Sequence, residues 1–167
     1  MPPATLPARL KFLGKDMIRN NAYTGLHLSL PSKFPISTMV ALRVLTYFEM
    51  KKDFQSMRKL TQSFWTAYWI NNKDISCEDV LIEEMEKAGL SPEQSRNIIH
   101  EQIEKDEIKN LLKENTDHAI NNGAFGAPFF IVTTADGTQD TFFGSDRFHH
   151  IAMFLNEEFD YKPIGKL

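Results

Sequence analysis

The chain has 167 residues, of which 42% are hydrophobic and 25% are charged, and its formal net charge is -3 at pH 7. This composition predicts a soluble globular protein, and a slightly acidic chain without a run of lysines or arginines argues against a nucleic-acid or membrane partner. The lone Cys77 excludes an internal disulfide, and the scattered histidines show no ligand spacing, so we expect no metal site.

Residues 1–36 are interrupted by prolines and predict an irregular segment with one short amphipathic helix at Leu10–Asn20. From Ser37 the apolar residues recur at helical spacing, which predicts two long helices over Met39–Met50 and Phe54–Ile70. The second helix has an aromatic face. Such a face is more typical of a core or a subunit interface than of a cofactor site.

Three further helices are predicted by their end signals. Ser76-Cys77-Glu78-Asp79 can begin a helix that Gly89 ends, and Ser91-Pro92-Glu93-Gln94 has the capping-box arrangement at the start of the next. Asp106 begins another helix, which Asn121-Asn122-Gly123 ends. We therefore expect an all-helical domain over residues 37–122.

The periodicity becomes strand-like only after Gly123. Phe129–Thr134 and Gln139–Phe143 flank an Asp-Gly turn signal, which predicts a β-hairpin. Ser145 or Asp146 is placed to cap a final helix over Arg147–Glu158.

A hairpin alone is marginally stable, so other elements must complete the sheet. The expected order is helix, proline-led strand, tight turn, strand and helix. This order is found in the carboxyl-terminal half of the thioredoxin fold. We therefore predict an α/β, thioredoxin-like fold: residues 123–167 form an incomplete, carboxyl-terminal half, and the helical domain is a large insertion. One face of the hairpin should be exposed, with Phe129, Ile131 and Phe142 or their neighbours on it.

Ala127-Pro128 precedes the first strand. In the thioredoxin fold a proline at this place is usually cis, and the residue before it offers its backbone N–H and C=O to an extended peptide. The cysteinyl portion of glutathione is such a peptide. The alternative is a proline that only shapes the loop.

Gly144-Ser145-Asp146 lies where a strand leads into a helix, so free N–H groups there favour a bound carboxylate. Ser145 could hold the carboxylate of a γ-glutamyl group, and Asp146 could hold its ammonium. The alternative is that both residues only cap the helix.

These residues also carry a resemblance to a known family. The chain resembles the kappa-class glutathione transferases in five motifs: Gly123-Ala124-Phe125-Gly126-Ala127-Pro128, Phe143-Gly144-Ser145-Asp146-Arg147, Pro2-Pro3, Glu86-Lys87-Ala88-Gly89 and Ser91-x-Glu93-Gln94. The resemblance implies a DsbA-like fold and a dimeric enzyme that conjugates glutathione, as substrate, to small electrophiles and can reduce hydroperoxides. It implies that Ala127, Ser145 and Asp146 bind glutathione, with Pro128 beside them.

The sequence departs from the family at one functional position. No residue of the chain matches the family's Ser-Pro-Tyr motif, whose serine stabilises the glutathione thiolate, so no catalytic residue is assigned. Arg9 lies near a basic position of the family and is either a contributor to the site or an exposed arginine. We therefore expect a shortened transferase whose activity could be lost.

Two alternatives are a non-catalytic glutathione-binding or regulatory subunit, and an interaction protein built on the helical domain. The resemblance implies a homodimer or a dimer with a full-length paralogue. It also implies a mitochondrial location, whereas Gly165-Lys166-Leu167 approximates a peroxisomal signal.

Overall fold

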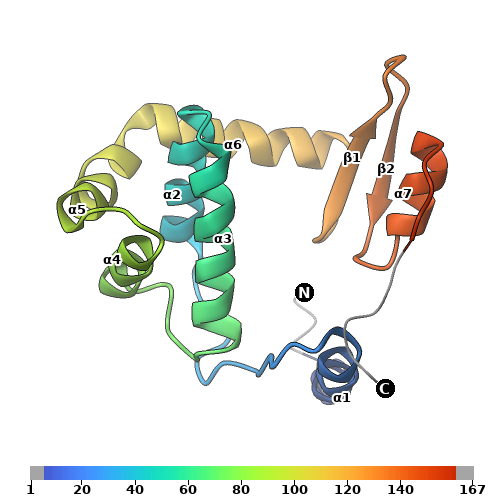
Figure 1. Cartoon of the computed structure of the whole chain (residues 1–167), viewed down its shortest axis with the longest axis horizontal. Coiled ribbons are helices and arrows are strands. Elements are labelled where there is room, and N and C mark those ends of the chain that lie inside the picture. The colour runs from blue at the N-terminus through green and yellow to red at the C-terminus, as the bar shows by residue number, and fades with distance from the viewer. Residues whose placement is uncertain (1–5, 161–167) are drawn as a thin grey trace. The chain divides into compact units, whose positions relative to one another are not determined.

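A computed structural model of the chain describes residues 6–160, which contain seven α-helices and one two-stranded antiparallel sheet. Figure 1 shows these elements in chain order. They form two compact units, one of which extends to Lys109 while the other begins at Asn110. No helix in the described part of the chain is both long and apolar enough to cross a membrane. The Pro2-Pro3 pair and the Gly165-Lys166-Leu167 tail lie outside the described residues.

The first helix is longer than the sequence indicates. Helix α1 is an 18-residue helix over Pro7–Thr24, with proline in its first turn and with Gly25 in the left-handed conformation at its end. The predicted range, Leu10–Asn20, is too short at both ends, because Pro7 is accommodated at the start of the helix and the helix continues until Gly25. None of the side chains of α1 is buried.

The helical unit is held together by one apolar core. Its elements after α1 are α2 (Met39–Met50), α3 (Phe54–Trp69), α4 (Glu78–Lys87), α5 (Pro92–His100) and a short 3-10 helix over Gln102–Glu104. Side chains from each of them are fully or almost fully buried, among them Val44, Leu60, Leu81, Ile99 and Ile103. The two long predicted helices are thereby confirmed.

Local capping accounts for several boundaries of these helices. The Asp53 carboxylate accepts a hydrogen bond from the Ser56 N–H at the start of α3, and Ser91 with Gln94 forms the predicted capping box at α5. At α4 the N-cap residue is Cys77, which makes no side-chain cap hydrogen bond. The predicted helix is present, but no side chain at its N-cap position caps it.

The second unit contains most of helix α6 (Asp106–Asn121), the hairpin and helix α7 (Phe148–Leu155). Strands β1 (Phe129–Thr133) and β2 (Gln139–Phe143) pair antiparallel, and Gly137 has a positive φ of 89° in the turn between them. The register aligns Phe129 with Phe143, at the end of the hairpin away from this turn.

Helix α7 (Phe148–Leu155) covers one face of the hairpin, as Figure 1 shows. The ring of Phe142 lies 5.8 Å from that of Phe154, so Phe142 belongs to the covered face. Phe143 is on the opposite face and is 42% exposed. The prediction named Phe142 or its neighbours for the exposed face: Phe142 itself is covered, because the register pairs it with Phe130 on the side of α7, and its neighbour Phe143 is the exposed residue.

Candidate glutathione site at the open end of the hairpin

The two motifs singled out from the sequence lie next to each other in the structure. Ala127-Pro128 leads into β1, Gly144 directly follows β2, and the Gly144 N–H donates a hydrogen bond of 3.0 Å to the Pro128 C=O. The hairpin register therefore brings Ala127 and the Ser145-Asp146 pair to the same end of the sheet. The Ala127–Pro128 peptide bond is cis, as expected from the thioredoxin fold.

Ala127 presents unpaired backbone groups at this end. The residue is exposed, and no hydrogen bond from its N–H or to its C=O is found within residues 6–160. A free N–H and C=O next to the end of a strand can pair with an extended peptide in the manner of an added strand.

Ser145 and Asp146 occupy the middle of a tight turn. The Arg147 N–H donates to the Gly144 C=O across 3.3 Å, which closes the turn, and both central residues are exposed. Helix α7 begins only at Phe148, with Arg147 as N-cap and no side-chain cap hydrogen bond. The predicted cap by Ser145 or Asp146 and the predicted helix start at Arg147 are therefore wrong. The turn intervenes, so both side chains are free of a capping role.

The charge of Asp146 has a neighbour of opposite sign. Its Oδ2 lies 3.0 Å from Nη1 of Arg147, while 69% of the Asp146 side chain remains exposed. The carboxylate can thus accept further hydrogen bonds from a cationic ligand group.

An aromatic cluster that the sequence did not single out borders the same loop. Phe125 is 76% exposed, and its ring centroid lies 4.5 Å from that of Phe143. Gly126 permits this packing, because a Cβ on it would lie 3.0 Å from the Phe143 ring. Phe125 stands between the small residues Ala124 and Gly126, and a large aromatic residue between two small ones is the signal that could have identified it.

Arg9, the other residue considered for the site, is exposed on α1. It belongs to the unit that extends to Lys109, whereas Ala127, Ser145 and Asp146 belong to the other unit. Its participation stays a prediction.

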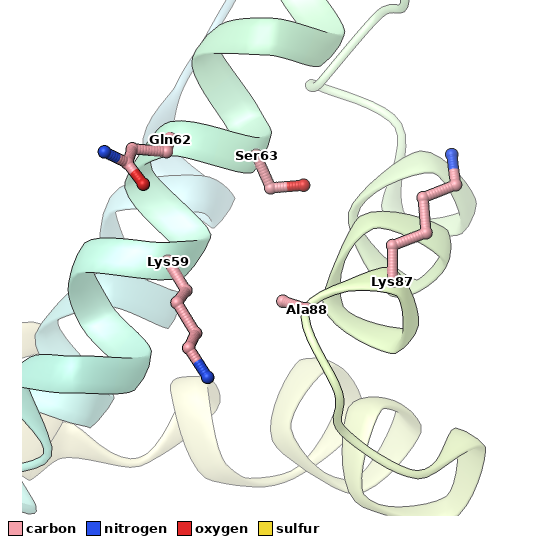
Figure 2. Close-up of a pocket in the computed structure, with 5 residues that line it drawn as sticks. All are labelled: Lys59, Gln62, Ser63, Lys87 and Ala88. Carbon is pink, nitrogen blue, oxygen red and sulfur yellow. The ribbon is translucent and has the colours of Figure 1, made fainter.

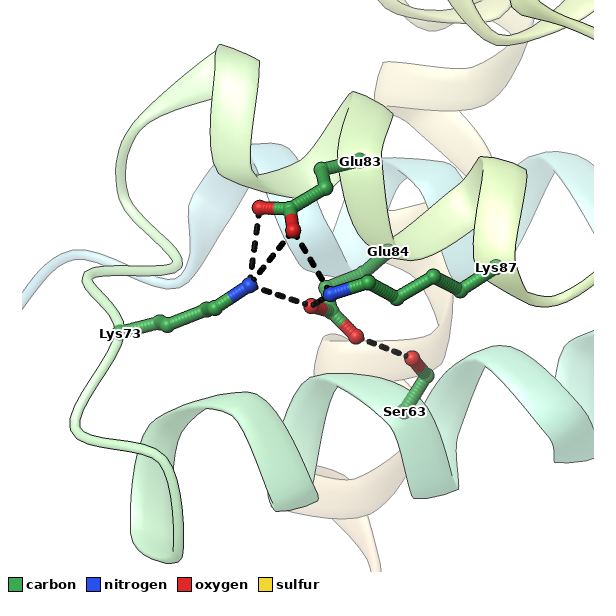
Figure 3. Close-up of polar contacts among 5 residues, drawn as sticks. All are labelled: Ser63, Lys73, Glu83, Glu84 and Lys87. Carbon is green, nitrogen blue, oxygen red and sulfur yellow. Dashed lines mark hydrogen bonds and ion pairs between the residues drawn. The ribbon is translucent and has the colours of Figure 1, made fainter.

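The helical unit has a second group of charged residues. Figure 3 shows Lys73 and Lys87 between Glu83 and Glu84, with Ser63 donating to Glu84 across 2.7 Å. Two lysines and two glutamates neutralise one another here. This arrangement is typical of a partly exposed ion-pair network within the helical unit rather than of a ligand site.

A pocket of about 390 Å³ lies beside this network and is lined by Lys59, Gln62, Ser63, Lys87 and Ala88. In Figure 2 the amino groups of Lys59 and Lys87 point in different directions. Since the two cations do not converge on one point, the pocket lacks the focused charge that an anion site requires.

Comparisons with known proteins show the family of the chain. The family model described as "DSBA-like thioredoxin domain" matches residues 1–156, which include Ala127, Ser145 and Asp146. The human protein named glutathione S-transferase kappa 1 is 33% identical over 168 aligned residues, covering 94% of this chain and 70% of the relative. The Caenorhabditis elegans proteins named glutathione S-transferase kappa 1 and kappa 2 are 32% and 29% identical, with 93% and 94% of this chain and 70% and 71% of the relatives covered.

The chain belongs to the kappa-class glutathione S-transferase family. The kappa-class relationship confirms the predicted DsbA-like, thioredoxin-type fold, which in this chain is mostly helical with a small sheet. The matched residues include both the open end of the hairpin and the lysine-lined pocket, so the choice of the hairpin end rests on its free backbone groups and its charged turn.

Proposed function

We propose that this protein is a glutathione transferase of the kappa class, which conjugates glutathione to small electrophiles and can reduce organic hydroperoxides. The observation that carries the proposal is the hydrogen bond from the Gly144 N–H to the Pro128 C=O. It keeps the backbone of Ala127 and the turn with Ser145 and Asp146 together in one compact unit.

The proposed placement of glutathione follows from the chemistry of each group. The cysteinyl backbone pairs with the free N–H and C=O of Ala127, beside Pro128. The γ-glutamyl carboxylate accepts hydrogen bonds from the Ser145 hydroxyl and nearby N–H groups, and the γ-glutamyl ammonium donates to the Asp146 carboxylate. The two opposite charges of one ligand group are thus met within a single turn.

A glutathione-binding test examines this placement directly. We expect calorimetry with the purified chain to detect glutathione binding and Asp146→Ala to weaken it about tenfold, because a charge-assisted hydrogen bond is lost. Asp140→Ala removes another exposed carboxylate of the same hairpin, on β2, and should leave the affinity unchanged. Equal affinities of the unaltered chain and Asp146→Ala would refute the role of Asp146.

A second candidate function is a non-catalytic glutathione-binding or regulatory subunit that pairs with a longer family member. It is favoured by one sequence observation, since none of the 167 residues matches the serine that stabilises the thiolate in the family. Turnover of an aryl halide, measured on the same samples, separates the two functions. Glutathione binding with little turnover would favour the regulatory function, whereas turnover like that of a longer family member would exclude it.

Assembly and location remain proposals that follow the family. We propose a dimer, either of two copies or with a longer paralogue, and a mitochondrial location, with the peroxisome as the alternative. Light scattering on the purified chain and fluorescence of a tagged copy in cells would test them.

A further inference from the structure

Gly144 lies directly beneath the carboxylate of Asp146. Its φ is +107°, and a Cβ built on it would lie 2.5 Å from Oδ1 of Asp146 and 3.7 Å from Cγ. Real Cβ atoms do not approach other atoms this closely. The Asp146 carboxylate therefore occupies the space that a side chain at position 144 would need.

The other oxygen of the same carboxylate is also held. Oδ2 of Asp146 lies 3.0 Å from Nη1 of Arg147. One carboxylate oxygen thus packs over the Gly144 backbone while the other contacts a guanidinium. A side chain that is 69% exposed would otherwise sample several rotamers, so these two contacts reduce the conformational freedom that ligand binding would have to remove.

We infer that Gly144 is a positioning residue for glutathione: the absence of a side chain at this position lets the Asp146 carboxylate fold back over the turn and meet the γ-glutamyl ammonium. The inference rests on the proposed function. It adds that glycine is needed at position 144 for the ligand as well as for the backbone conformation.

The hairpin contains a matched control for the backbone requirement. Gly137 also has a positive φ, of 89°, and a Cβ on it would meet no atom within 4 Å. Substitution by alanine strains the backbone at both glycines, but only at Gly144 does it also displace a carboxylate.

The test compares two ligands on three proteins by calorimetry: the unaltered chain, Gly144→Ala and Gly137→Ala. The ligands are glutathione and glutaryl-cysteinylglycine, which has hydrogen in place of the ammonium. We expect Gly144→Ala to weaken glutathione about fivefold to tenfold, the range for loss of a partly exposed charged contact. Its effect on the glutaryl peptide, and the effect of Gly137→Ala on either ligand, should stay within about twofold.

Asp146→Glu is a second variant that leaves the backbone of Gly144 intact. Its extra methylene places the carboxylate beyond the space above Gly144, so we expect a loss of glutathione affinity similar to that of Gly144→Ala, again without effect on the glutaryl peptide.

Three outcomes would overturn the inference, and one of them concerns the proposed function itself. Equal losses for Gly144→Ala with both ligands would show a general distortion of the turn. Full glutathione affinity in Asp146→Glu would show that the position of the carboxylate is unimportant. No binding of glutathione by the unaltered chain would remove the proposed function and the inference with it.

Discussion

At the scale of single residues, Glu84 shows how the helical unit accommodates a buried charge. Only 5% of its side chain is exposed, and it accepts hydrogen bonds from Ser63, Lys73 and Lys87 at 2.7, 3.1 and 2.8 Å (Figure 3). Burial by itself would raise the pKa of Glu84, but hydrogen bonds from Lys87 and Ser63 outweigh burial, so the pKa lies below its ordinary value. The charged form is therefore the stable one at neutral pH.

Removal of this carboxylate should destabilise the protein. We expect Glu84→Ala to lower the free energy of unfolding by about 1–3 kcal/mol, because the Ser63 hydroxyl and two lysines lose their common partner. Glu86→Ala, on the same helix but outside the network, should change stability by less than about 0.5 kcal/mol. Urea denaturation measures both, and equal stabilities of the two variants would contradict the role given to Glu84.

At the scale of secondary-structure elements, helix α5 contains two serines in opposite situations. Ser91 accepts a hydrogen bond from the Gln94 N–H across 3.2 Å, and its own N–H donates to the Gln94 side chain across 3.0 Å. Ser95 is fully buried, and its hydroxyl has no hydrogen-bond partner among the described residues. The Ser91 hydroxyl therefore stabilises the helix, whereas burial of the unpaired Ser95 hydroxyl costs desolvation free energy.

The two serines should respond differently to alanine. Ser91→Ala removes a capping hydrogen bond and should lower the free energy of unfolding by about 1 kcal/mol. Ser95→Ala removes an unpaired buried hydroxyl and adds a good helix former, so stability should stay equal or rise by up to about 1 kcal/mol. Thermal denaturation of the two variants beside the unaltered chain tests this, and a larger loss from Ser95→Ala than from Ser91→Ala would disprove it.

At the scale of the whole molecule, the ion pairs make stability depend on pH. Hydrogen bonds from Lys33 and Ser76 hold the pKa of Asp74 at about 2, and hydrogen bonds from Lys73 and Lys87 hold that of Glu83 at about 2. In the unfolded chain the pKa of each of these carboxyls is about 4. Between about pH 4.5 and pH 2 the unfolded state therefore binds more protons than the folded state, and acid favours unfolding.

The melting temperature should accordingly be nearly constant from pH 7 to pH 5.5 and fall steadily below about pH 4.5. Asp74→Asn should lower it at neutral pH and flatten the acid dependence, because the ion pair with Lys33 no longer has a titrating partner. Glu157→Gln, an exposed carboxylate outside these pairs, should keep the full acid dependence. Calorimetric scans across this pH range measure the melting temperature. A melting temperature that stays unchanged down to pH 3 would contradict the predicted acid dependence.

Much of the fold follows from short-range patterns. The two long helices, the capping box at Ser91, the glycine after α4 and the Asp-Gly hairpin turn all agree with the structure. Each depends on residues within one or two turns of one another, which is why local periodicity and end signals suffice. The errors in the helices lie at their ends: both ends of α1, the cap of α4 and the start of α7.

The sequence by itself determined the order of the elements, the family resemblance and the residue types that can meet a peptide, a carboxylate and an ammonium. Only the tertiary structure decided that Gly144 hydrogen-bonds Pro128, that Phe142 packs under α7 while Phe143 remains exposed, and that the Asp146 carboxylate covers Gly144. The first two depend on the register between strands, and the third depends on the rotamer of one side chain. Neither register nor rotamer is encoded in a local pattern, because both arise from contacts that form only when the hairpin and its turn have folded.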